Sequence, residues 1–234
     1  MFLSYRILPV MRIVPLGETA WILAELEASP WWVADRLREA AVPGLADAAA
    51  AYETVGVYFE FPPGQVQRDQ IESAVALLEG RQPPLMPLVE VPVCYELGED
   101  VEEISSRLGL TVAGLAQAHS KVEYECFAVG FQPGFPYLGY LPDSLSGIPR
   151  LASPRTRVAA GSVGITGRQT GIYPGGSPGG WPLIGRTPML IADLDHGKFL
   201  FRSGLRVRFM PIGQAEYDSF DPGEHPGTIE ECPP

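Results

Sequence analysis

The string GFQPGFPYLGYL occupies residues 130–141, and SPRTRVAAGSVGI (153–165) and QTGIYPGGSPGGWPLIGRTP (169–188) follow it. Glycine and proline recur throughout these three strings, and both residues interrupt regular structure and favour tight turns. Short strands separated by such turns at this density predict a closed or nearly closed β-barrel. The apolar segments expected as strands are 124–131, 158–166, 189–192, 198–202 and 205–210.

The chain before residue 81 has a different pattern, in which alternating apolar strands are interleaved with segments of helical spacing. The expected elements are strands at 11–15, 20–26 and 50–61, one helix starting at Ser29-Pro30, and a second helix over 69–79. The proline-rich segment RQPPLMPL (81–88) is stiff and cannot be helical. We therefore expect a small α+β domain over residues 1–85 and a barrel domain over 86–234.

The barrel region is expected to begin with a strand and two short helices. Residues 89–95 are apolar and predict the strand. Asp100 and Glu103 have the spacing of a capping box, which predicts a helix through Leu108. Thr111 is the expected cap of a second helix that ends near Ala118.

The composition bounds the possible functions. The chain has 234 residues, a formal net charge of −11 and 46% hydrophobic residues, so it can build a real core. The acidic balance and the lack of a Lys/Arg run argue against nucleic-acid binding, and no apolar run reaches the ~18 residues of a membrane span. Three cysteines fit neither a disulfide framework nor a zinc site, so we expect a cytoplasmic protein. Translation is expected to start at Met1 or Met11.

Several catalytic motifs are missing. The sequence contains no P-loop and no G-x-G-x-x-G after a strand, and no His/Cys/Asp cluster has the spacing of a metal site. The string GGSPG matches a nucleophile elbow only formally, because Pro178 follows the serine and no helix is expected after it. We therefore expect neither a metal nor a cofactor bound by this chain.

Candidate binding residues lie within the three glycine- and proline-rich strings. Arg155 and Arg186 are possible partners of an anion, because guanidinium grips carboxylate or phosphate in a fork. A structural ion pair is an equally good interpretation of each arginine. The aromatic residues either pack a core or line a pocket, and His119 alone is an ordinary histidine by base rates.

These strings also resemble a known family. His119-Ser120 followed by Tyr124, then GFQPGFPYLG, PRTRVAAGSVGI, QTGIYPGGSPGGW and LIGRTP, are similar to the family of KipI, allophanate hydrolase subunit 1 and the B-type subunit of 5-oxoprolinase. The resemblance is dense over 89–210 and weaker over 11–80. The chain departs from it at Gln132, where small or apolar residues are common, and at Leu205, where the family usually has an acidic residue.

The resemblance implies an N-terminal α+β domain and a C-terminal cyclophilin-like β-barrel. It further implies a B-type subunit of an ATP-dependent complex that hydrolyses 5-oxoproline to L-glutamate, and a chain that is inactive alone. The partners would be a homologous C-type (KipA-like) barrel subunit and an A-type (lactam-utilisation-like) subunit, which would use the ATP. Within the matching motifs, His119 is the candidate base and Arg155 the candidate carboxylate holder. The candidate substrate-binding residues are Gln169, Tyr173, Ser177, Gly179, Gly180 and Trp181.

Two other functions stay open for members of such a family. One is inhibition of a sporulation histidine kinase, in which the barrel surface would dock on the kinase. The other is a carboxyltransferase or allophanate hydrolase subunit 1 role in a urea carboxylase-like system. That role would need a separate biotin carrier, because the chain has no A-M-K-M string.

Overall fold

The structure is a computed structural model that describes residues 11–221 and the backbone of 230–231, and the chain divides into two compact units, 1–85 and 86–234. The choice between Met1 and Met11 as the start concerns residues 1–10, which lie outside the described residues. The first unit is an α/β sheet region and the second is a nearly closed barrel, so the predicted fold class is confirmed.

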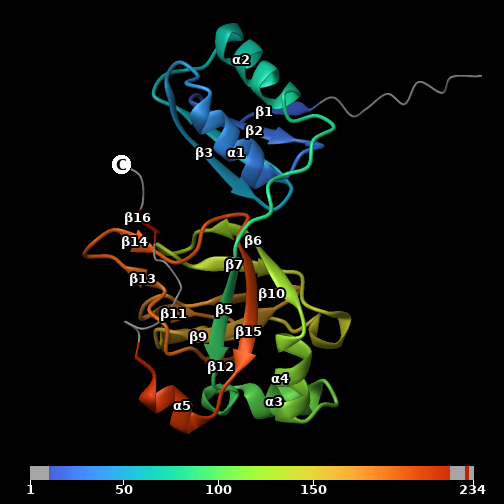
Figure 1. Cartoon of the computed structure of the whole chain (residues 1–234), viewed down its shortest axis with the longest axis vertical. Helices are drawn as coiled ribbons and strands as arrows, with labels where there is room; N and C mark the ends of the chain where they lie inside the picture. The colour runs from blue at the N-terminus through green and yellow to red at the C-terminus, as the bar shows by residue number, and fades with distance from the viewer. Residues whose placement is uncertain (1–10, 222–229, 232–234) are drawn as a thin grey trace, which may run out of the picture. The chain divides into compact units, whose positions relative to one another are not determined.

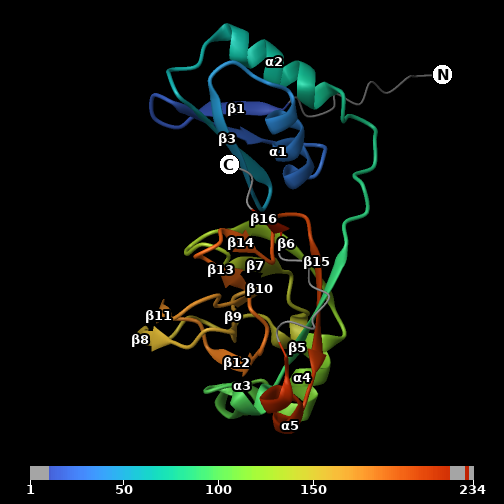
Figure 2. The same ribbon diagram turned by 60° about the vertical axis from the view of Figure 1, so that its left-hand side comes forward.

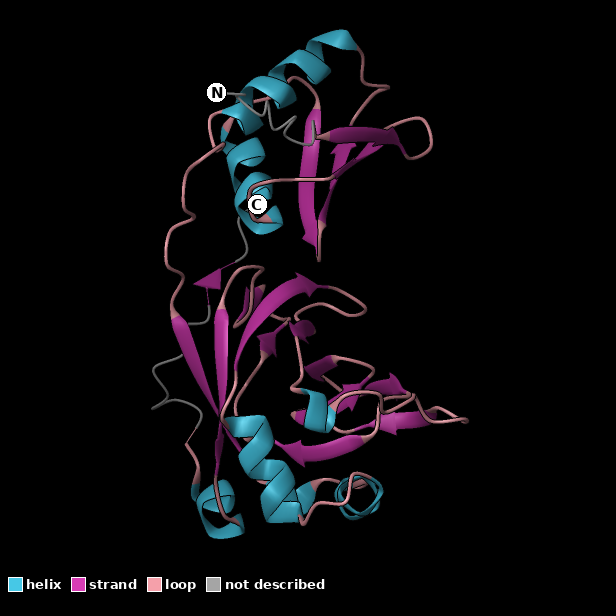
Figure 3. Ribbon diagram, turned by 90° about the vertical axis from the view of Figure 1, so that its right-hand side faces the viewer, coloured by secondary structure: helices cyan, strands magenta, loops and turns pink. Residues whose placement is uncertain are grey.

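The first unit is a four-stranded antiparallel sheet in the order β1-β2-β4-β3, with two helices packed on one face (Figure 3). Its core forms where α1 buries Trp31, Val33 and Leu37 at helical spacing against the sheet. The elements are β1 (Arg12–Pro15), β2 (Ala20–Ala24), α1 (Pro30–Glu39), β3 (Leu45–Ala51), β4 (Thr54–Phe59) and α2 (Gln65–Ala76).

The single strand predicted over 50–61 was wrong, because this stretch belongs to a hairpin. Strand β3 ends at Ala51, Tyr52 turns the chain with φ +55°, and β4 begins at Thr54. The alanine-rich sequence of β3 hid the strand, since alanine is depleted in strands and its burial here comes only from packing against α1 and β4.

The second unit is built on a seven-stranded sheet in the order β12-β9-β10-β7-β6-β15-β5, in which only the β5–β15 pair is parallel (Figure 1). Its first half contains β5 (Leu88–Val93), η1 (Tyr95–Leu97), α3 (Val101–Arg107), α4 (Val112–Ser120), β6 (Glu123–Val129), β7 (Pro136–Gly139) and η2 (Asp143–Leu145). Its second half contains β8 (Arg155–Val158), β9 (Ser162–Thr166), β10 (Gln169–Ile172), β11 (Ser177–Gly179), β12 (Leu183–Arg186), β13 (Ala192–Asp193), β14 (Lys198–Phe199), β15 (Arg206–Pro211), α5 (Gln214–Ser219) and β16 (Glu230–Glu231).

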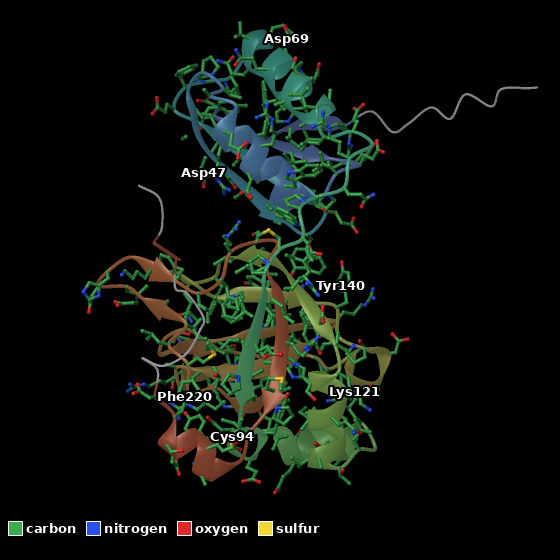
Figure 4. The ribbon with its side chains drawn as sticks, in the orientation of Figure 1. Asp47, Asp69, Cys94, Lys121, Tyr140 and Phe220 are labelled. Carbon is green, nitrogen blue, oxygen red and sulfur yellow. The ribbon has the colours of Figure 1, made fainter. Side chains whose placement is uncertain are left out.

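The two edge strands of this sheet meet at one point, and this meeting closes the barrel. Cys94, just after β5, exchanges two backbone hydrogen bonds of 2.9 and 3.0 Å with Arg186 of β12. Figure 4 marks Cys94 at this end of β5. Gly185 permits the approach, because a Cβ at this position would lie 2.6 Å from the Val93 side chain. Beyond this bridge, Asp100 occupies the edge of β12, since its backbone amide donates to the Leu183 carbonyl at 2.9 Å and its carboxylate accepts from the Leu183 amide at 2.6 Å.

Two short helices cover one end of the barrel, and their caps differ. Thr111 caps α4 as predicted, its hydroxyl accepting from the Gly114 amide at 3.0 Å. The predicted capping box at Asp100 was wrong. Asp100 does precede α3, but its carboxylate accepts from Arg155 at 2.6 Å and from the Leu183 amide at 2.6 Å instead. A charged partner outcompetes a local amide for this carboxylate.

The barrel unit has two separate apolar layers, one inside the barrel and one outside it. Along β10, Thr170 and Ile172 are fully buried in the interior, so Gly171 between them faces outward. A Cβ at Gly171 would lie 2.8 Å from the Phe135 ring. The tip of the ring therefore packs directly against the backbone of β10 on the outer face of the sheet.

Candidate functional site

The outer layer is an aromatic cluster lying between the barrel wall and a two-stranded flap. It consists of Phe135, Val158, Tyr173, Trp181 and Leu183, with Tyr137 packed against it, and we call it the outer aromatic cluster. Strands β8 and β11 form the flap and pair only with each other (Figure 2). The edge-to-face geometry of its rings, with centroids 5.0–5.9 Å apart, is the preferred arrangement of aromatic pairs.

The glycines of the three sequence strings make room for these rings. A Cβ at Gly164 would approach Trp181 at 3.0 Å, and one at Gly179 would approach the Tyr173 hydroxyl at 2.5 Å. Glycine at these places is required by close approach of a ring rather than by backbone conformation, because neither residue has a positive φ. These two glycines, which the sequence associates with turns, thus serve packing.

Tyr173 and Trp181 are 1% and 5% exposed, so the packing interpretation of these two residues holds in the structure. The Tyr173 ring packs edge to face on Phe135 with centroids 5.2 Å apart. Burial raises the pKa of Tyr173, and the nearby charges of Arg150 and Arg155 oppose that shift. Tyr173 is therefore a neutral phenol held next to two guanidinium groups.

Arg155 joins the flap to the end of α3. Its Nε donates to Glu99 at 3.1 Å and one Nη donates to Asp100 at 2.6 Å, and these partners raise the pKa of Arg155. The other nitrogen, Nη1, is buried and has no hydrogen-bond partner within the described residues. Arg155 thus forms structural ion pairs and keeps one nitrogen, Nη1, that no described residue accepts from.

The remaining predicted residues are placed as follows. Gly180 lies beside the cluster, and its carbonyl accepts from the Leu151 amide at 2.7 Å. Ser177 is half-buried in β11, with its hydroxyl 3.2 Å from the Pro178 carbonyl. Arg186 Nε donates to the Ala160 carbonyl at 2.9 Å. Gln169 lies at the far end of β10 from Tyr173, four residues or about 13 Å along the strand.

His119 lies inside the barrel and is 0% exposed, within α4 rather than after it. Its Nδ1 lies 2.7 Å from the Tyr95 hydroxyl and its Nε2 3.0 Å from the Thr170 hydroxyl. The imidazole also stacks on Phe209 with centroids 4.3 Å apart. Burial lowers the pKa of His119 to about 3, so the ring is neutral at pH 7.

This geometry does not support the role of base that the sequence suggested for His119. Both ring nitrogens are occupied by neighbouring hydroxyl groups, and no face of the ring meets solvent. A base needs hydrogen-bond reach of the proton that it removes. His119 instead ties α4, η1, β10 and β15 together through a satisfied polar network.

A groove of about 570 Å³ lies beside α3 and α4. Glu99 belongs both to its wall and to the Arg155 ion pair. With Glu96 and Glu102 also in the wall, the groove is acidic and repels a carboxylate ligand. Among the described residues, no three His, Cys, Asp or Glu side chains are grouped as metal ligands. No helix in that part of the chain is long and apolar enough to cross a membrane.

Two features of the site were missed from sequence. Asp100 was interpreted as a helix cap, and its pairing with Arg155 joins residues 55 positions apart, which no local pattern reveals. Gln132 was noted only as a departure from the usual residue type, and its Nε2 is buried without a partner in the described part of the chain. Gln132 follows Phe131 within the motif GFQPGFPYLG, and this position in a family motif could have marked it as a candidate site residue.

Three comparisons identify relatives. The family described as "Carboxyltransferase domain, subdomain C and D" matches residues 11–200. A protein of Escherichia coli O157:H7, named as the B-type subunit of 5-oxoprolinase, is 40% identical over 213 residues, covering 86% of this chain and 95% of that protein. A protein of the same name from Bacillus subtilis (strain 168) is 36% identical over 188 residues, covering 76% and 78%. The crystal structure of TTHA0988 is 37% identical with a TM-score of 0.70, and covers 82% of this chain and 40% of that chain.

Proposed function

Since the chain belongs to the carboxyltransferase domain family, subdomains C and D, we propose that it is the B-type subunit of an ATP-dependent 5-oxoprolinase complex. The observation that carries this proposal is identity of 35–40% to three proteins that bear the name of this 5-oxoprolinase component. The alignments span 78–99% of those proteins, so the likeness is not confined to one motif.

The reaction that we assign to the complex is hydrolysis of 5-oxoproline to L-glutamate. The substrate is a small cyclic amide that carries a carboxylate, and an unactivated amide resists attack by water. Transfer of a phosphoryl group from ATP to the amide oxygen makes the ring carbon a better electrophile. The sequence has no P-loop, so we assign ATP binding to another subunit.

We place the substrate against the outer aromatic cluster at the flap. The unused Nη1 of Arg155 supports this choice, because a guanidinium donor without a partner fits one oxygen of a carboxylate. The charge of Arg150 opposes the raised pKa of both Tyr137 and Tyr173, so a second cation lies near these two phenols. His119 serves here as a positioning residue that holds Thr170 of β10 in place.

The partners that we propose are a homologous C-type barrel subunit and an A-type subunit. The support for partners is the identity of 35–40% to three proteins that are each named as one subunit of 5-oxoprolinase, because a subunit acts together with others. The A-type subunit would bind ATP. The chain alone is expected to be inactive.

A second candidate is a carboxyltransferase component, which the description of the matching family favours. In that case the chain would act with a separate biotin carrier. Activity with a carboxylated carrier and none with 5-oxoproline would favour this candidate.

The test is reconstitution. This chain is co-expressed with its C-type and A-type subunits, and 5-oxoproline-dependent ATP hydrolysis and glutamate release are measured with and without it. We expect turnover only when all three are present. A stable complex without turnover would contradict the proposal.

The site is tested in the same assay with Arg155→Lys, which keeps the charge but loses the fork. We expect an increase in KM for 5-oxoproline of about tenfold, since one hydrogen bond to a charged group contributes about 1.5–3 kcal/mol. The matched control is Arg12→Lys, which changes an exposed ion pair of the first unit. Equal KM values for both variants would remove Arg155 from the site.

A further inference from the structure

The loop between β6 and β7 has a backbone conformation that its sequence disfavours. Phe131 has φ +69°, although a bulky residue rarely takes a positive φ. The loop is nevertheless fixed, because the Gly130 amide donates to the Phe135 carbonyl at 3.0 Å and the Phe135 amide to the Gln132 carbonyl at 3.1 Å. Gly134 packs closely against the β13–β14 hairpin, where a Cβ would lie 2.9 Å from Ala192.

This strained residue carries an exposed ring. Phe131 is 62% exposed, yet the ring contacts Phe135 and Tyr173 edge to face, with centroids 5.5 and 6.4 Å apart. The outer aromatic cluster therefore reaches the surface through Phe131. An apolar face of a ligand that rests on Phe131 would lie next to Tyr173.

The neighbouring residue has an unsatisfied polar group. Gln132 Nε2 is buried and has no hydrogen-bond partner in the described part of the chain. Buried donors without partners are rare in native proteins because each one costs free energy. Strain at one residue and an orphan donor at the next are typical of sites at which a ligand compensates both.

We propose that Phe131 and Gln132 form the specificity-determining part of the substrate site. Gln132 Nε2 donates to an oxygen of a small ring-shaped acid or cyclic amide, and the Phe131 ring covers the apolar face of that ligand. Arg155, whose charge also acts on Tyr173, takes the carboxylate. This inference rests on the proposed function and adds to it the two residues that recognise the ring.

The decisive variant is Gln132→Met, which keeps the length and volume of the side chain and removes the amide. If the amide serves only the ligand, its loss relieves a cost in the free protein. The melting temperature of the isolated chain is then expected to stay unchanged or rise by about 2–4 °C. KM for 5-oxoproline in the reconstituted complex is expected to rise about tenfold or more. Gln132→Glu, which replaces the donor by an acceptor, is expected to raise KM further.

Gln117→Met is the matched control, because Gln117 is exposed on α4. It is expected to change neither the melting temperature nor KM. A fall in the melting temperature of Gln132→Met, with or without a change of KM, would show that the amide has a structural partner and would overturn the inference. Wild-type KM in the Gln132→Met complex would overturn it as well, while leaving the proposed function intact. A wild-type complex without 5-oxoproline turnover would overturn the proposed function, and the inference would fall with it.

Discussion

The buried imidazole of His119 makes the stability of this protein depend on pH in a calculable way. In the folded chain the pKa of His119 is lowered to about 3 by burial, whereas an exposed histidine has 6.5. Between these two values the unfolded chain binds a proton that the folded chain does not bind. The stabilising contribution of the neutral imidazole is therefore fully present above pH 6.5 and is lost as pH falls towards 3.

The magnitude follows from the size of this window. Each pH unit below 6.5 costs about 1.4 kcal/mol, so at pH 4.5 the loss from this one residue is roughly 2–3 kcal/mol. That is a large part of the ~5–15 kcal/mol by which a domain is stable. The residue is 0% exposed, so screening by solvent does not reduce the effect.

The assay compares urea unfolding of the wild type and His119→Gln at pH 7.0 and 4.5. Glutamine offers a donor and an acceptor to Tyr95 and Thr170 but does not titrate. All carboxylates titrate equally in both proteins, so the difference in the pH-dependent loss isolates His119. We expect the wild type to lose roughly 2–3 kcal/mol more than the variant. Gln117→Met, at an exposed residue of the same helix, is the control and is expected to behave as the wild type does.

Equal pH-dependent losses in wild type and His119→Gln would refute the reasoning. If the variant does not fold, the wild type still provides the test by NMR. The chain has three histidines, and one of them should show no change of its imidazole C2–H shift between pH 8 and 4.5. Three histidines that all titrate near pH 6.5 would also refute it.

Three further predictions concern stability and accessibility. Asp100→Ala removes the acceptor of both Arg155 and the Leu183 amide. We expect urea titration to show that the free energy of unfolding falls by about 1–3 kcal/mol. An unchanged free energy would mean that this partly buried pair does not stabilise the fold. Gly171→Ala places a Cβ 2.8 Å from the Phe135 ring and the Pro136 carbonyl, and should destabilise the chain by about 1–3 kcal/mol; Gly175→Ala, with open space around it, is the control and should have no effect. Cys94 and Cys126 are buried free thiols, and burial raises the pKa of each. We therefore expect iodoacetamide at pH 8 to leave both thiols unmodified in the folded chain, as checked by mass spectrometry. Rapid labelling of either cysteine would disprove its burial.

The fold class could be predicted because its signals are local. Glycine and proline between short apolar runs indicate turns wherever they occur, and the period of apolar residues separates the helices of the first unit from its strands. Strand β3 escaped this reasoning, because alanine becomes a strand residue only through its neighbours. The helix at 101–107 was predicted correctly for a wrong reason, since Asp100 does not cap it.

The candidate site could be predicted only in part. The sequence placed Arg155, Tyr173, Gly179, Gly180 and Trp181 among residues of interest, and the fold brings them together at the flap. The sequence did not show that two other candidates lie apart from this group. Gln169 lies at the far end of β10, and His119 is buried inside the barrel.

By itself, then, the sequence determined the fold class and the motifs that carry the family resemblance, because both depend on neighbours along the chain. It did not give the full order of the strands, since β3, β7, β10 and β12 were not expected and the strand expected over 158–166 is divided between β8 and β9. Only the tertiary structure decided which side of the barrel wall each motif occupies and which polar atoms find partners. Gly171 and Thr170 are adjacent in sequence, yet one admits the Phe135 ring outside the barrel and the other binds His119 within it. Burial, and with it the pKa of a histidine or the cost of an unpaired amide, depends on groups that are distant in sequence and meet only when the barrel closes.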